Sequence, residues 1–447
     1  MNGTEQGGTL GLGACVGILI GGMVGSAIFS LSGVTVFTAG PAAILSWALA
    51  ALIMLSYGLI TAELATRFPK SGGVFVFPAR AIGGAWAGRV WGWISTWAFI
   101  NANIAAIAFS AIYVATYLGV GFPAFAGLQR PLALGTIGFC FILNCVKFST
   151  AGRVNSALVV LLGGTLTVFI VTAFASGAWD PSLLTPFFGQ GAGGRAGFVE
   201  AIPVAMVAYG TIVGVAFIVS EVKDPRKNVP ASMFIALALV MTLYLLVITA
   251  TVGLVPASFL AENPGMRYIP LYAACFTKLA AFPWLARVVS VSAVLALLTT
   301  ALVVTALTTR AMQSVSEAGL LPRWLSVTGP SGSPVPAAAL TASVSALVAC
   351  FPQFTSMIVN YGALFATITI AVNCVSLLYA RKREPSREGS FRAPLGRALP
   401  VVTMAVLGVC YAPGVRSGGI RLWAYTLGSY CVGFALFAFQ TRRRKRG

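Results

Sequence analysis

Long apolar runs separated by short polar segments dominate the chain. A helix of about 20 apolar residues crosses the roughly 30 Å hydrocarbon core of a bilayer. Twelve runs approach or exceed this length, and they lie near residues 11–38, 41–66, 91–119, 131–148, 154–176, 197–221, 231–255, 281–313, 335–353, 356–380, 398–415 and 420–440. No soluble domain fits between them. The pattern therefore predicts an all-α polytopic membrane protein with 12 transmembrane helices.

Two of the runs contain a glycine-centred break at membrane depth. The first reads Gly-Gly-Met-Val-Gly-Ser-Ala-Ile-Phe over 21–29, and the second reads Val-Ala-Tyr-Gly-Thr-Ile-Val-Gly over 207–214. An unsatisfied backbone group in hydrocarbon costs several kcal/mol, so such a break must be buried in protein or line a wet cavity. Half-helix amides can face an anionic group, and unwound carbonyls can hold an ammonium group or an ion. The two breaks therefore indicate one shared binding site.

The two breaks lie about 185 residues apart and divide the chain into two similar halves. Each half contains five spans, and an odd number of spans makes consecutive units inverted in the membrane. This predicts a first five-helix repeat over 1–176, a second, inverted repeat over 197–381, helices 11 and 12 over 398–440, and a basic tail over 441–447.

Composition and charge agree with a membrane location. The chain is 58% hydrophobic and 9% charged, which is outside the range of soluble domains. Its net charge is +19, but 22 of the 29 Lys and Arg residues fall in segments on one side of the predicted membrane. This bias predicts a multi-pass protein of the plasma (cell inner) membrane, with cytoplasmic N and C termini and no nucleic acid partner. The tail residues 442–446 are expected to contact anionic lipid.

The side chains argue against catalysis. There is no histidine, only ten carboxylates, and the eight cysteines are scattered without metal-ligand spacing. We therefore expect neither an enzyme nor a metal site, and no cofactor. A channel would need a continuous polar path, whereas the polar groups gather at two breaks. A transport-deficient sensor would use the same pocket and stays an alternative. The sequence does not fix the oligomeric state.

Several stretches carry a family resemblance. They are Gly25-Ser26-Ala27-Ile28-Phe29 and residues 62–73, 221–230, 317–322 and 391–396. With them the chain resembles the amino acid-polyamine-organocation (APC) superfamily from about residue 10 to 440. The resemblance implies the leucine-transporter-type fold, a 5+5 inverted repeat with broken helices 1 and 6. It also implies a secondary transporter that moves a small-molecule amino acid by alternating access.

The resemblance places the substrate at the breaks. The substrate carboxylate would meet amides near Ser26, Ala27 and Ile28, and its ammonium group would meet carbonyls near Val207, Ala208 and Gly210. Tyr209 is large enough to cover the ligand, and its hydroxyl needs a partner when buried. The full set of implied substrate-binding residues is Val24, Gly25, Ser26, Ala27, Ile28, Thr96, Ile100, Val207, Ala208, Tyr209, Gly210, Ile212 and Val304.

Two departures from the family pattern bear on the substrate. Ile212 and Val213 stand where many members have phenylalanine and glutamate, so no acid lies near the predicted pocket. An unpaired ammonium or guanidinium group would cost several kcal/mol there. The sequence therefore favours neutral, apolar amino acids. A cationic amino acid or polyamine transporter or exchanger is the alternative.

The sequence is compatible with transport coupled to Na⁺, transport coupled to H⁺, or exchange. The resemblance aligns Thr299 and Thr300 with a small polar pair of the family. With carbonyls near Gly21 and Val24 they form a candidate sodium site, because a hard cation prefers oxygen ligands. Threonines within helices more often bond their own backbone.

Two acids at cytoplasmic span ends, Glu63 and Glu221, are candidates for a cytoplasmic gate. Arg67, Arg153 and Arg310 are their candidate partners.

Overall fold

The computed structural model describes residues 9–68, 73–146, 151–329, 332–383, 391–417 and 419–446, and these ranges contain helices and no β-strand. One isolated bridge pairs Leu10 with Val222. Residues 1–8 and the side chains of 443–447 lie outside the described part, so the expected lipid contact of the basic tail falls largely outside it.

A helix or a group of short helices lies on each of the twelve apolar runs. The α-helices are α1 (Leu12–Met23), α2 (Ser26–Ser30), α3 (Ser32–Ala39), α4 (Ala43–Arg67), α5 (Gly73–Ala81), α6 (Ala85–Gly121), α7 (Gln129–Cys145), α8 (Ala151–Ala175), α9 (Gly197–Val207), α10 (Gly214–Phe217), α11 (Pro225–Leu254), α12 (Ala257–Glu262), α13 (Pro270–Thr277), α14 (Pro283–Glu317), α15 (Val335–Ala349), α16 (Thr355–Arg383), α17 (Ala398–Ser417) and α18 (Gly419–Arg446). Eight helical segments of the described chain are long and apolar enough to cross a membrane. The count of 12 spans and the 5+5 repeat stay predictions.

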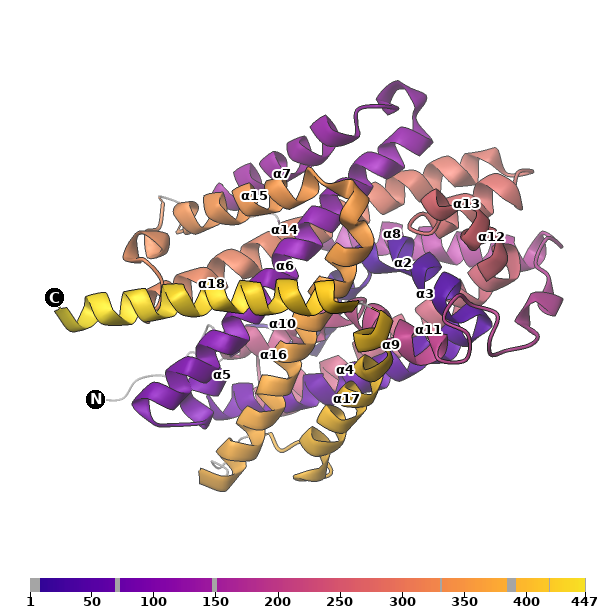
Figure 1. Cartoon of the computed structure of the whole chain (residues 1–447). Helices are drawn as coiled ribbons and strands as arrows, with labels where there is room; N and C mark the ends of the chain where they lie inside the picture. Colours follow the sequence, from indigo (N-terminus) through magenta and orange to yellow (C-terminus); the bar gives the residue numbers. More distant parts are fainter. Residues whose placement is uncertain are drawn as a thin grey trace.

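The two longest helices, α6 and α14, pack along each other, and α16 lies against α6 (Figure 1). Elements of the two predicted repeats also interdigitate, because α1 lies against α11 and α4 lies against α9 and α11. This arrangement brings residues near 25 and near 210 into one core. Proline begins α11, α13 and α14, where the first helical residue needs no N–H partner.

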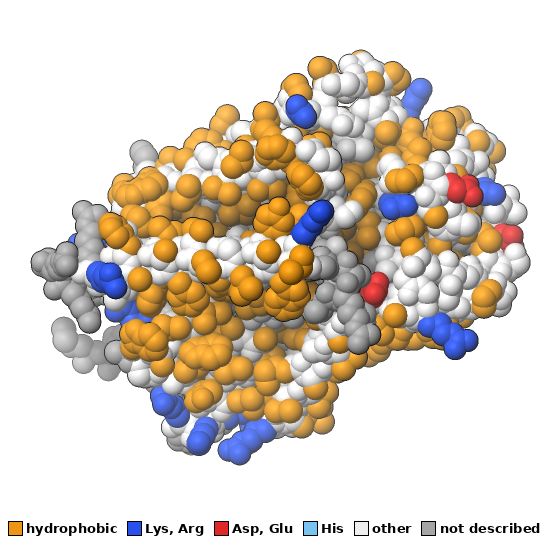
Figure 2. Space-filling view, viewed as in Figure 1, with side chains coloured by type: hydrophobic (Ala, Val, Ile, Leu, Met, Phe, Trp, Pro, Cys, Tyr) orange, Lys and Arg blue, Asp and Glu red, His pale blue; other side chains and the backbone are white. Residues whose placement is uncertain are grey.

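The outer face of the bundle is strongly apolar. Figure 2 shows hydrophobic side chains over α15 and α18, whereas Lys and Arg lie mainly at the two ends of the bundle, including the end where α5 lies. Leu427 and Phe439 of α18 are exposed. Exposed apolar area of this extent suits contact with lipid rather than water.

Candidate functional site

The first break lies between α1 and α2. The helix ends at Met23, Val24 has φ −71° and ψ 80°, and Gly25 has φ −139° and ψ −149°. A new helix starts at Ser26, whose N–H donates to Thr300 Oγ1 of α14 at 3.1 Å. The first amides of a helix lack partners within it, so Thr300 takes the place of a capping side chain.

Two tyrosines satisfy carbonyls next to the first break. The Tyr244 hydroxyl of α11 donates to the Met23 carbonyl at 2.6 Å, and the Tyr117 hydroxyl of α6 donates to the Phe29 carbonyl at 2.7 Å. Both tyrosine side chains are fully buried. A buried carbonyl without a donor would cost roughly 1–3 kcal/mol, so these bonds help to maintain the break. In the sequence, Tyr117 and Tyr244 are distinguished only as hydroxyl-bearing aromatic residues within two of the apolar spans.

The second break begins where α9 ends, at Val207. A 3₁₀ turn, η4 (Gly210–Val213), the short α10 and a second turn, η5 (Val219–Glu221), replace a continuous helix. Tyr209 is fully buried, and its ring centroid lies 6.1 Å from Trp47 and 5.4 Å from Tyr244. The Tyr209 hydroxyl has no hydrogen-bond partner among the described residues, and neither has Thr211 Oγ1. The second break therefore contains two buried polar atoms without a hydrogen-bond partner among the described residues.

Glycines bring these segments into contact. A Cβ placed at Gly22 would lie 2.9 Å from Thr211 Oγ1, so the first and second breaks touch. A Cβ at Gly25 would lie 2.5 Å from Thr300 Oγ1. Larger residues at these two positions would overlap their neighbours. The structure thus brings both breaks and α14 together, and their use as one binding site stays a prediction.

The other predicted substrate residues lie in differing surroundings. Val24, Ser26, Ala27, Ile28, Thr96, Ile100, Ala208 and Val304 are all buried, whereas Val207 is 38% exposed and Gly210 is also exposed. Thr96 donates to the Gly92 carbonyl of its own helix at 2.8 Å. Ile212 is fully buried and lies close to Gly58 of α4. The assignment of these residues to the substrate pocket stays a prediction.

The candidate sodium ligands are partly engaged. The hydroxyls of Thr299 and Thr300 both donate to the Ala296 carbonyl, at 3.0 and 2.9 Å. Thr300 also accepts the Ser26 amide, which leaves it one lone pair. A sodium site with Gly21 and Val24 stays a prediction.

Glu63 forms a buried ion cluster at the end of α4. Its Oε1 accepts from Arg67 Nη2 at 2.9 Å and from Arg381 Nε of α16 at 2.9 Å. Its Oε2 accepts from Arg381 Nη2 and, at 2.8 Å, from the Ala393 amide. Arg381 also donates to the Gly396 carbonyl. One carboxylate therefore joins α4, α16 and the segment 391–396. We call Glu63, Arg67, Arg381 and the Ala393 amide together the Glu63 cluster.

The predicted partners of the two acids can now be compared with the structure. Arg67 binds Glu63 as expected, Arg381 was missed, and the side chain of Arg153 lies outside the described residues. Glu221 is exposed, and its carbonyl accepts the Leu10 amide at 2.9 Å. The two candidate gate acids thus differ, since the Glu63 side chain is buried and ion-paired whereas Glu221 is exposed and lies beside Leu10.

Comparison with known protein families shows to which family this chain belongs. The model of a family described as amino acid permease matches residues 10–436, nearly the whole chain. The chain belongs to the amino acid permease family. The resemblance to the APC superfamily is thereby confirmed, and the permease is an integral membrane protein from a family of transporters.

Three relatives illustrate the breadth of this family. The permease is 26% identical to the branched-chain amino acid permease BcaP of Bacillus subtilis, over 96% of this chain and 91% of the relative. It is 27% identical to the methylthioribose transporter of Bacillus subtilis, over 90% of this chain and 88% of the relative. It is also 26% identical to cationic amino acid transporter 7, chloroplastic, of Arabidopsis thaliana, over 80% of this chain and 63% of the relative.

Proposed function

We propose that the permease carries neutral, apolar amino acids across the plasma membrane by alternating access. The observation that carries this proposal is the lack of charge at the breaks: residues 20–30 and 204–214 contain no Asp, Glu, Lys or Arg. A cationic side chain bound there would lack a counter-ion, at a cost of several kcal/mol. The similarity to a branched-chain amino acid permease supports the same substrate class.

In this proposal backbone dipoles hold the zwitterion. Amides in the first turn of α2, at Ala27 and Ile28, face the carboxylate, because the Ser26 amide already binds Thr300. Carbonyls at Val207 and Ala208 face the ammonium group. The free hydroxyls of Tyr209 and Thr211 supply further polar contacts.

The Glu63 cluster supplies a gate at one end of the bundle. It ties α4 to α16 and to the segment 391–396, so separation of Glu63 from Arg381 would let these parts move apart. Glu221, which is exposed beside Leu10, is the second proposed gate residue.

Uptake by purified permease in liposomes tests the substrate class. We expect faster uptake of labelled leucine, isoleucine or valine than of lysine, arginine or putrescine. Sodium and pH gradients, applied in turn, separate Na⁺ coupling, H⁺ coupling and exchange. Uptake of arginine or putrescine without uptake of any neutral amino acid would reject the proposed substrate. Binding of neutral amino acids without transport would support the sensor alternative.

A further inference from the structure

A group of exposed basic side chains lies at the end of the bundle where α16 ends and α17 begins (Figure 1). We call it the basic surface, and its members are Arg80, Lys382, Arg383, Arg392 and Arg397. The first belongs to the last turn of α5, the next two to the last turn of α16, and the other two to the segment that leads into α17. None of the five forms an ion pair with another described residue. Like charges gathered in this way repel one another and favour an anionic ligand.

Two contacts hold the three segments of the basic surface together. The buried guanidinium group of Arg381 donates to the Ala393 carbonyl at 3.3 Å and to the Gly396 carbonyl, which fixes the segment before α17 beside the end of α16. A Cβ placed at Gly83 would overlap Arg383 Nη1, so this guanidinium group lies on the turn that follows α5. The basic side chains therefore belong to one surface although they are far apart in the sequence.

Leu395 lies between two of these basic residues in the sequence. Its side chain is 73% exposed, and its φ of +60° is in the left-handed region, which is unfavourable for a leucine. The Glu63 cluster maintains this turn, because Ala393 donates its amide to Glu63 and Arg381 binds the Gly396 carbonyl. The turn thus presents an apolar side chain next to arginines, a combination typical of segments that enter a lipid headgroup layer.

The basic surface lies where two candidate membrane spans end. The span Trp86–Gly121 begins beside it, and the span Pro352–Arg383 ends in it. Trp86 is 69% exposed. Tryptophan and arginine are both typical of the membrane–water interface, which places these charges at the depth of the lipid phosphates.

We propose that the basic surface binds an anionic phospholipid. The arginines donate to its phosphate, and the Leu395 side chain enters the adjacent acyl region. The segment that carries Arg392 and Arg397 also donates the Ala393 amide to Glu63, so a bound lipid favours the closed Glu63 cluster. Lipid binding is independent of the solute that the permease carries, whereas its effect on the gate rests on the proposed function.

Thermal denaturation of the purified full-length permease in detergent with added phosphatidylglycerol tests this site. We expect phosphatidylglycerol, but not zwitterionic phosphatidylcholine, to raise the midpoint of unfolding. Each basic residue strengthens attraction to anionic lipid about fivefold, so Arg392→Gln/Arg397→Gln should raise the half-saturating fraction of phosphatidylglycerol about 30-fold. Its stability in phosphatidylcholine should equal that of the wild type, because both side chains are exposed and make no ion pair with the described residues.

The matched control is Arg130→Gln/Arg287→Gln, which removes two exposed cations near the other end of α6. A Cβ at Gly121 would lie 2.8 Å from Ser290, so the start of α14 lies at that end as well. This variant should respond to phosphatidylglycerol like the wild type. Leu395→Asn keeps all five charges, and asparagine tolerates the left-handed region. It should match the wild type in phosphatidylcholine and respond more weakly to phosphatidylglycerol.

Three results would overturn the lipid site. They are equal stabilisation by the two lipids, a wild-type response in Arg392→Gln/Arg397→Gln, and stabilisation by glycerol 1-phosphate as strong as that by phosphatidylglycerol. The last result would assign the surface to a soluble phosphate. A selective response to phosphatidylglycerol in a permease that moves no amino acid in liposomes would support the lipid site and contradict the proposed function.

Discussion

Glu63→Gln should strongly destabilise the permease and abolish most of its uptake. The side chains of Arg67 and Arg381 are only 5% and 4% exposed, and Glu63 supplies the carboxylate that both of them bind. Removing one partner from a buried ion cluster leaves uncompensated charge, and the loss is about 3–5 kcal/mol of folding free energy. Thermal denaturation in detergent measures the stability, and leucine uptake in liposomes measures transport.

Two controls separate this effect from a general loss of charge. Glu317→Gln removes an exposed acid that accepts a hydrogen bond from Gln313, and it should change stability by less than about 0.5 kcal/mol. The double variant Glu63→Gln/Arg381→Gln should be less destabilised than the sum of the two single changes, because it removes both charges of one pair. Wild-type stability in Glu63→Gln, or simple additivity in the double variant, would contradict the Glu63 cluster as described.

Gly25→Ala should slow leucine uptake by roughly ten- to a hundredfold. The added Cβ would lie 2.5 Å from Thr300 Oγ1, and Thr300 holds the Ser26 amide at the start of α2. Overpacking a well-packed site costs about 1–3 kcal/mol, and here it would displace the amides proposed to bind the substrate. Initial uptake rates at several leucine concentrations measure the effect.

Gly17→Ala is the matched control for this change. Gly17 lies in α1, and a Cβ there meets nothing within 4 Å, so uptake should remain near the wild-type rate. Replacing Thr300 by Ala removes the atom that the new methyl group would contact. Gly25→Ala should therefore be less harmful in a Thr300→Ala background than in the wild type. Equal uptake by Gly25→Ala and Gly17→Ala would refute the close approach of α14 to the break.

The local pattern of the chain was sufficient to predict the long helices and the interruptions, but not the short helices α5, α12 and α13, which lie between the apolar runs. Apolar runs predicted the positions of the helical segments, and glycine clusters predicted where α1 and α9 end. Both signals depend on neighbouring residues, which the sequence displays directly. The i,i+4 spacing of Glu63 and Arg67 is also a signal from residues close in the sequence, and the structure confirms that ion pair.

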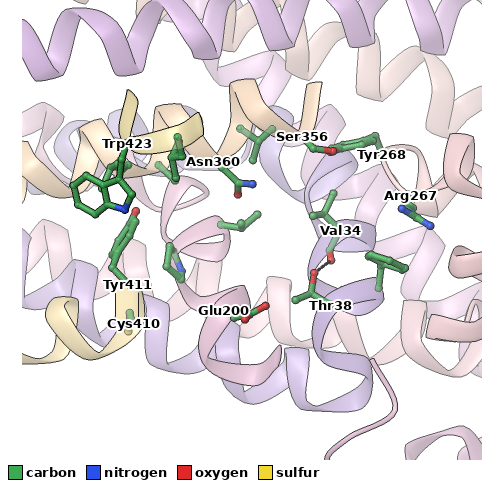
Figure 3. Close-up of a pocket in the computed structure, with 17 residues that line it drawn as sticks. Val34, Thr38, Glu200, Arg267, Tyr268, Ser356, Asn360, Cys410, Tyr411 and Trp423 are labelled. Carbon is green, nitrogen blue, oxygen red and sulfur yellow. Dashed lines mark hydrogen bonds between the residues drawn. The ribbon is translucent and has the colours of Figure 1, made fainter. Parts of the chain in front are cut away.

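The missed contacts join residues that are far apart in the sequence. Arg381 follows Glu63 by 318 positions, and Tyr244 follows Met23 by 221 positions. Nothing local distinguishes Arg381 from other basic residues at helix ends, because its role depends on how α16 packs near α4. A cavity beside Glu200 and Arg267 was missed for the same reason, since residues of five separate helices and a loop line it (Figure 3).

A cryo-electron microscopy structure of the permease with leucine tests the shared site at the breaks most directly. We expect leucine between α2 and the end of α9, with its carboxylate about 3 Å from the amides of Ala27 and Ile28. Its ammonium group should lie at similar distance from the carbonyls of Val207 and Ala208. Leucine bound elsewhere at saturation, with the space between the two breaks empty, would contradict the proposed site.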